Sequence, residues 1–191
     1  MFCSKRSQSA RQQTGVYATR DDFRRIFTED MAGLHLLAYL LTTDEEKAEQ
    51  CFVAGLDDTI KSNPVFKQWA RSWSKRAIIK NAIKAVAPLP GEPRVAAPAA
   101  VDPQVGDPET DALITAVAQL PAFQRFVFVM SVLEGYAVTE CSTLLACTAS
   151  QVVEARSQAL TAVSVARTPA AAAAMNPVVS WKSLFTSAEV A

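Results

Sequence analysis

Residues 112–163 constrain the fold of this chain more than any other segment, because they predict consecutive helices with defined ends. Apolar residues recur at helical spacing over 113–120 and again over 123–133. Pro121 stands where the second of these helices starts, a position that tolerates proline. Gly135 follows that helix, where glycine readily takes the left-handed conformation that ends helices. The segment therefore predicts a small, wholly helical unit.

The last two helices of this unit are predicted over 138–146 and 149–163, separated by Cys147-Thr148. Thr148 and Gln151 stand three residues apart and form a capping box, which marks the start of the final helix. A short helix, a tight turn and a longer helix are typical of a helix-turn-helix, in which the second helix enters the DNA major groove.

The N-terminal half predicts three further helices. One apolar stripe runs over 21–41, and Thr43 with Glu46 forms a second capping box that opens the next helix. Ser62-Asn63-Pro64 ends it, and a third helix is predicted over 64–86. The fold class is therefore all-α, with two small helical domains, the first of three helices and the second of four.

Charge is segregated along the chain although its formal net charge is zero. Residues 65–87 contain six Lys and Arg and no acid, so we expect any nucleic-acid contact to lie mainly there. Trp69 and Trp73 lie in the same segment, and their spacing fits two alternatives. In the first, each indole stacks with an unstacked base, an interaction worth about 1–3 kcal/mol per base. In the second, both indoles fill the core of the helical module.

Proline divides the two helical halves, since residues 88–111 hold six of the ten prolines. We therefore expect five parts. They are a disordered basic N-terminus (1–20), a helical domain (21–87), a Pro-rich linker (88–111), a helix-turn-helix domain (112–165) and an Ala-rich C-terminal tail (166–191). An apolar patch in the tail favours a partly docked helix.

Catalytic and metal-binding signatures do not stand out in the sequence. His35 is the only histidine, and Cys3, Cys51, Cys141 and Cys147 lack zinc spacing. Phosphate-binding glycine loops, HExxH and nucleophile elbows are missing too. We therefore expect a non-enzyme with no cofactor and no metal. No apolar run approaches the roughly 18 residues that span a bilayer, and no signal peptide precedes the helices, so we expect a cytoplasmic location without membrane insertion.

Several residues in both halves match landmarks of one family. In the second half they are Leu120-Pro121, Arg125, Phe128, Glu134-Gly135-Tyr136, Glu140, Leu145, Thr148 and Val152; in the first half they are Ala48-Glu49, Trp73 and Asn81. With these residues the chain resembles a divergent sigma-70 family factor of the extracytoplasmic-function type. The resemblance implies that region two (21–87) binds the polymerase clamp and melts the minus-ten element, and that region four (112–165) reads the minus-thirty-five element.

The resemblance also implies three sets of contact residues. Polymerase would be bound through Ala48, Glu49, Gln50 and Val53. Melted DNA would contact Lys67, Trp69, Arg71, Trp73, Lys75, Arg76, Lys80, Asn81 and Lys84. The recognition helix would use Thr148, Ser150, Gln151, Val153, Glu154 and Arg156, although Gln151 has a competing use in the capping box.

The expected partners are bacterial core RNA polymerase, promoter DNA and an anti-sigma factor, and the expected function is DNA-binding transcription initiation. The chain departs from the family where Gln50, Val53 and Ala54 replace acidic and amide clamp residues, and where the recognition helix lacks several Lys and Arg. Two alternatives therefore stay open. One is a degenerate helix-turn-helix regulator without initiation activity; the other is a protein-interaction module, with Val153 and Leu160 as apolar contacts.

Overall fold

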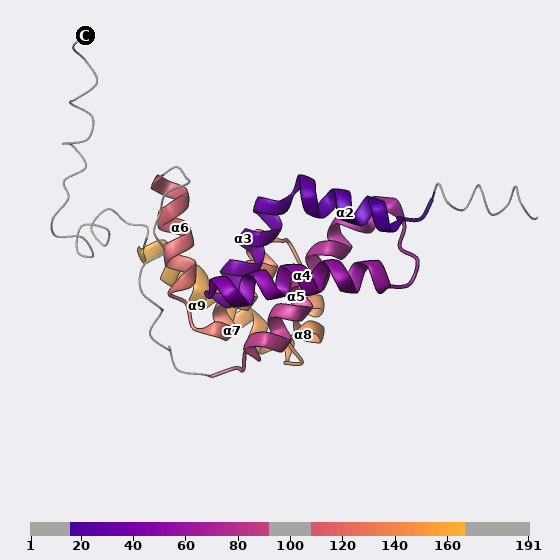
Figure 1. Cartoon of the computed structure of the whole chain (residues 1–191). Coiled ribbons are helices and arrows are strands. Elements are labelled where there is room, and N and C mark those ends of the chain that lie inside the picture. The colour runs from indigo at the N-terminus through magenta and orange to yellow at the C-terminus, as the bar shows by residue number, and fades with distance from the viewer. Residues whose placement is uncertain (1–15, 92–107, 167–191) are drawn as a thin grey trace, which may run out of the picture.

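The computed structural model describes residues 16–91 and 108–166, and every regular element within these ranges is a helix (Figure 1). The all-α prediction is therefore confirmed. Residues 1–15, 92–107 and 167–191 lie outside the described residues, and with them most of the predicted N-terminus, the middle of the predicted linker and nearly all of the predicted tail.

The first half contains four α-helices where three were predicted. The prediction of a single helix over 21–41 is wrong, because the backbone of Asp30 leaves helical geometry (φ −113°, ψ 27°) and separates two helices. The elements are α2 (Arg20–Glu29), α3 (Met31–Thr42), α4 (Glu45–Lys61), the 3₁₀ turn η1 (Lys67–Trp69) and α5 (Ala70–Val86).

Two predicted boundaries in this half shift. Asp44, not Thr43, caps α4, since its carboxylate accepts a hydrogen bond from the Lys47 N–H at 3.1 Å. Thr43 is left-handed (φ 54°) and ends α3 instead. Residues 16–20, predicted as disordered, are ordered against residues 65–67, with the Ala18 N–H 2.7 Å from the carbonyl oxygen of Val65.

The helix pair α4 and α5 crosses in the middle of the molecule (Figure 1). The two helices approach closely at Gly55, where an added Cβ would lie 2.7 Å from Cγ1 of Ile78. Gly55 therefore permits a close approach of α4 and α5, and a larger side chain at this position would push the two helices apart. The approach fixes the position of α5, and α5 carries the basic residues of the candidate site.

The second half follows the predicted order. Its elements are α6 (Pro108–Ala118), α7 (Ala122–Phe128), the π-helical turn η2 (Val129–Leu133), α8 (Val138–Leu144) and α9 (Ala149–Ala166). Pro121 directly precedes α7, and Gly135 is left-handed (φ 71°) after η2, as expected. The Thr148–Gln151 capping box is confirmed, since each residue's backbone N–H donates to the other's side-chain oxygen, at 2.9 and 3.2 Å.

The two halves share one hydrophobic core. Helix α3 packs against α6, α7 and η2. Fully buried side chains from the first half (Leu34, Leu41, Ile78) belong to the same cluster as fully buried side chains from the second (Val117, Phe126, Met130, Val152). Within the described residues, the two helical halves therefore pack directly on each other.

Candidate nucleic-acid interface

An open groove of about 590 Å³ runs between α5 and the turn that joins η2 to α8. The N-terminal half contributes Trp69, Arg71, Ser72, Trp73, Lys75, Arg76 and Lys80 to its lining, and the C-terminal half contributes Glu134, Gly135, Tyr136 and Glu140. Six of the nine residues predicted to contact melted DNA are therefore brought to one groove.

Both tryptophans of this groove face solvent. Trp69 is 55% exposed and Trp73 36%, while Ala70, Ala77 and Ile78 of α5 are buried. The alternative in which both tryptophans fill the core is therefore wrong. Small and β-branched side chains fill the core at this place, because α5 packs closely on α4. The indole faces are left at the groove, where they offer an aromatic surface to a ligand.

The cations of the groove have partners from distant parts of the chain. Arg71 Nη1 lies 2.7 Å from Oδ2 of Asp30, and Arg76 Nη1 lies 4.0 Å from Oε1 of Glu140. Lys80 Nζ lies 5.9 Å from the Trp73 ring centroid, within the range of a cation–π contact. Four cations face two carboxylates in the lining, so the groove keeps an excess of positive charge.

The closest cross-groove contact joins Lys75 to Glu134. The Lys75 ammonium donates to both carboxylate oxygens of Glu134, at 2.8 and 3.1 Å. The Glu134 side chain is only 16% exposed and that of Lys75 33%, so this ion pair is partly shielded from water. An ion pair in this position is screened less by salt than a fully exposed one.

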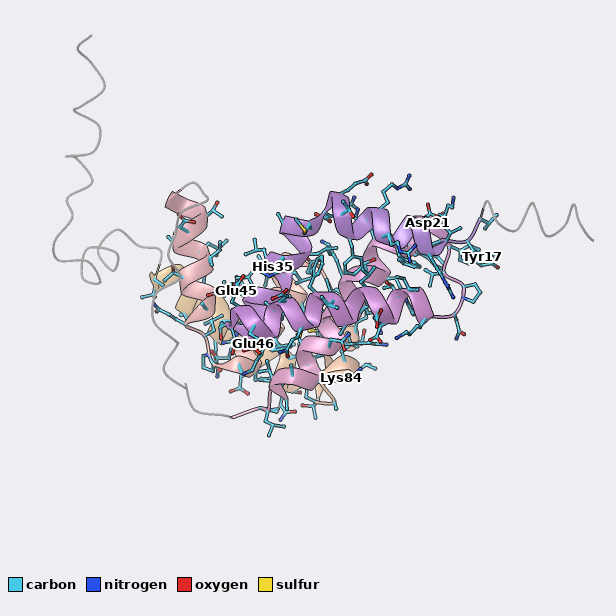
Figure 2. The ribbon with its side chains drawn as sticks, viewed as in Figure 1. Tyr17, Asp21, His35, Glu45, Glu46 and Lys84 are labelled. Carbon is cyan, nitrogen blue, oxygen red and sulfur yellow. The ribbon has the colours of Figure 1, made fainter. Side chains whose placement is uncertain are left out.

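Three of the predicted DNA contacts lie outside this groove. Lys67 pairs with Asp22 at 3.5 Å. The Asn81 amide donates to Asp58 at 2.9 Å and to the Ala77 carbonyl at 3.0 Å. Lys84 lies towards the C-terminal end of α5 (Figure 2) and lines a neighbouring groove beside Asp58. That groove shares Trp73, Arg76 and Lys80 with the first one.

Sequence reasoning missed the groove residues of the second half as site residues. The sequence identifies Glu134, Gly135 and Tyr136 only as a helix end and a family landmark, because the contact with α5 bridges about sixty residues of sequence. Burial raises the pKa of Tyr136 to about 12, so its hydroxyl stays protonated at neutral pH. The only local signal was the acidic Glu134 beside a turn glycine.

Helix α9, the predicted recognition helix, presents a nearly neutral surface. Ser150, Val153, Glu154 and Arg156 are exposed, and Arg156 is the only cation of the helix. The carboxamide oxygen of Gln151 accepts from both the backbone N–H and the hydroxyl of Thr148, so this side chain serves the capping box. Contact with a DNA backbone by α9 therefore has little charge to support it.

The predicted polymerase contacts are divided by burial. Ala48 is fully buried in the core, so its predicted role as a contact residue is wrong: it has no exposed surface to offer a partner. Glu49, Gln50 and Val53 are exposed, and Val53 is 57% exposed. These three lie on the outer face of α4, whose first turn carries Glu46 (Figure 2).

Further chemistry is sparse in the described ranges. His35 Nε2 lies 3.5 Å from Oε1 of Glu45, and the two residues are adjacent in Figure 2. Across residues 16–91 and 108–166 no three His, Cys, Asp or Glu gather as a metal site would require. In the same ranges no helix combines the length and apolar character needed to cross a membrane.

Similarity to known proteins is found among solved structures. No protein-family model matches the chain, and no curated protein matches it. Among solved structures, the chain is similar to the sigma factor RpoE in its co-crystal structure with the anti-sigma factor NepR from Bartonella quintana. The two share 17% sequence identity with a TM-score of 0.43, over 76% of this chain and 96% of that chain.

Proposed function

We propose that this protein is a sigma-like transcription factor that binds single-stranded promoter DNA in the α5 groove and core RNA polymerase through α4. One observation carries the proposal: two solvent-facing tryptophans stand beside four cations in a single open groove. Single-stranded nucleic acid is held by this combination, in which bases stack on aromatic faces and phosphates meet Lys and Arg.

The chemistry of the groove suits an unstacked strand better than a duplex. A base laid on Trp69 or Trp73 gains stacking energy whichever base it is. Lys75, Arg76 and Lys80 follow one another along α5, so a phosphate backbone running along the helix meets several cations in turn. In the sigma-like reading, this strand is the melted promoter element.

Charge reversal tests the nucleic-acid part of the proposal. We expect Lys80→Glu to weaken binding of a labelled single strand of about ten nucleotides by about tenfold at low salt, because one phosphate contact becomes a repulsion. Lys47→Glu is the matched control, since Lys47 lies in the first turn of α4 and does not line the groove. Equal losses in both variants would contradict a site in the groove.

Co-elution with bacterial core RNA polymerase on a sizing column tests the polymerase part. We expect a stoichiometric complex with the wild-type protein and its loss in Val53→Asp, because Val53 is the large apolar side chain exposed on the outer face of α4. Ala162→Asp, an exposed change on α9, is the control and should co-elute. Free elution of the wild-type protein would refute polymerase binding.

A second candidate function rests on α9. Val153 is 56% exposed and Leu160 41%, and they stand two turns apart on one helix face that has little charge. Such a face suits an apolar protein surface better than DNA, and would make the helix-turn-helix a protein-binding element. In that case Val153→Asp abolishes complex formation with a protein partner while single-strand binding in the α5 groove is unchanged.

A further inference from the structure

The second half of the chain places two carboxylates beside cations of the α5 groove. Glu134 accepts two hydrogen bonds from the Lys75 ammonium, and Glu140 lies 4.0 Å from the Arg76 guanidinium. Both cations belong to α5 and both line the groove. A carboxylate and a phosphate present the same kind of group to a cation, a pair of anionic oxygens.

The backbone holds Glu134 firmly in this place. Its N–H donates to the Val129 carbonyl at 3.0 Å, which closes the π-helical turn η2. Gly135 then turns the chain with φ 71°, and the Tyr136 N–H donates to the Met130 carbonyl at 2.9 Å. The carboxylate therefore reaches Lys75 from a fixed turn rather than from a free loop.

We infer that Glu134, with Glu140 beside it, is an internal competitor for the phosphate-binding positions of the groove, an inference that rests on the proposed single-strand binding. A phosphate that binds Lys75 must displace the Glu134 carboxylate. Strand binding therefore weakens one link between the two halves, and the packing of the second half on α5 weakens strand binding.

The test measures affinity of the full chain for a fluorescein-labelled single strand of about ten nucleotides by fluorescence anisotropy. We expect Glu134→Gln to bind about three- to tenfold more tightly than wild type, because a neutral amide competes less well than a carboxylate for Lys75. Glu140→Gln should act in the same direction and more weakly, given its longer contact. Its amide oxygen still accepts from the Ala137 N–H, so the start of α8 is kept.

Glu45→Gln is the matched control. Glu45 is an exposed carboxylate in the first turn of α4 that does not line the groove, so its neutralisation should leave affinity unchanged. A general effect of net charge would raise affinity equally in all three variants and would overturn the inference. Circular dichroism melts of each variant establish that the fold is retained.

The remaining outcomes separate this inference from the proposed function. If Glu134→Gln and Glu140→Gln bind as wild type while Lys80→Glu binds less, the groove takes the strand but the carboxylates do not compete, and only the inference fails. If neither wild type nor Glu134→Gln binds the strand, the proposed function fails and the inference with it.

Discussion

The guanidinium of Arg125 donates two hydrogen bonds to the backbone carbonyl of Leu41, at 3.3 and 3.2 Å, and so joins the two halves of the molecule. Leu41 lies in the last turn of α3, where helix carbonyls lack an intrahelical partner. A third hydrogen bond reaches the Leu120 carbonyl at 3.0 Å. Arg125 is 6% exposed, and burial lowers its pKa to about 10, so it remains charged at neutral pH.

Arg125→Ala tests this link. Removal leaves the buried carbonyls of Leu41 and Leu120 without that donor and opens a cavity between the halves, so we expect a loss of about 2–4 kcal/mol in the free energy of unfolding. Arg156→Ala removes an exposed arginine from α9 and should change it by less than about 0.5 kcal/mol. Urea unfolding measures both; equal effects would mean that Arg125 does not link the halves.

Ala146 ends α8 in the left-handed region, with φ 51°. A residue with a Cβ is strained there and glycine is not, so Ala146→Gly should raise the free energy of unfolding by about 0.5–1 kcal/mol. Ala162→Gly, at an exposed position inside α9, should lower it by about 1 kcal/mol, because glycine is a poor helix former. If thermal or urea unfolding showed a lower free energy of unfolding for Ala146→Gly than for the wild type, the backbone of Ala146 would not be strained.

Trp73 should contribute to strand binding, because its indole is exposed at the groove and the Lys80 ammonium lies 5.9 Å from its ring centroid, where it would be near a stacked base. We expect Trp73→Ala to weaken single-strand binding by about 1–3 kcal/mol. Trp73→Phe keeps an aromatic face and should recover part of the affinity. Anisotropy titrations of the two variants provide the comparison, and equal affinities of Trp73→Ala and wild type would exclude stacking at this position.

The N-terminal cap of α2 should be sensitive to acid. Hydrogen bonds from the backbone N–H and the hydroxyl of Thr19 hold the pKa of Asp22 below its usual 3.8. Since the folded pKa is the lower one, the carboxylate stabilises the fold fully above pH 3.8, and this contribution is lost as pH falls through the folded value.

Thr19→Val removes the hydroxyl and keeps the backbone N–H, so the pKa of Asp22 should rise only part of the way towards 3.8. Carbon-detected NMR titration of the carboxylates measures the change. Asp44 is the internal control, because the Lys47 N–H lowers its pKa at a different helix and its titration should not move. An unchanged Asp22 pKa would show that the hydroxyl bond contributes nothing.

Local sequence determined the helices and most of their ends. Pro121, Gly135 and the Thr148–Gln151 pair act on their own backbone within one turn, so their effect is readable without knowing the rest of the fold. The prediction failed where two local signals compete. Thr43 is a plausible cap by sequence, yet it takes the left-handed end of α3 and leaves the cap of α4 to Asp44.

Tertiary packing alone decided which side chains reach the candidate site. The spacing of Trp69 and Trp73 fits a buried stripe as well as an exposed one, and only the close packing of α4 on α5 leaves both indoles at the surface. The pairing of Lys75 with Glu134 and of Arg125 with Leu41 has no local signal, because each joins residues far apart in the chain. Sequence periodicity specifies a helix and its apolar face; the neighbour that covers that face depends on the fold as a whole.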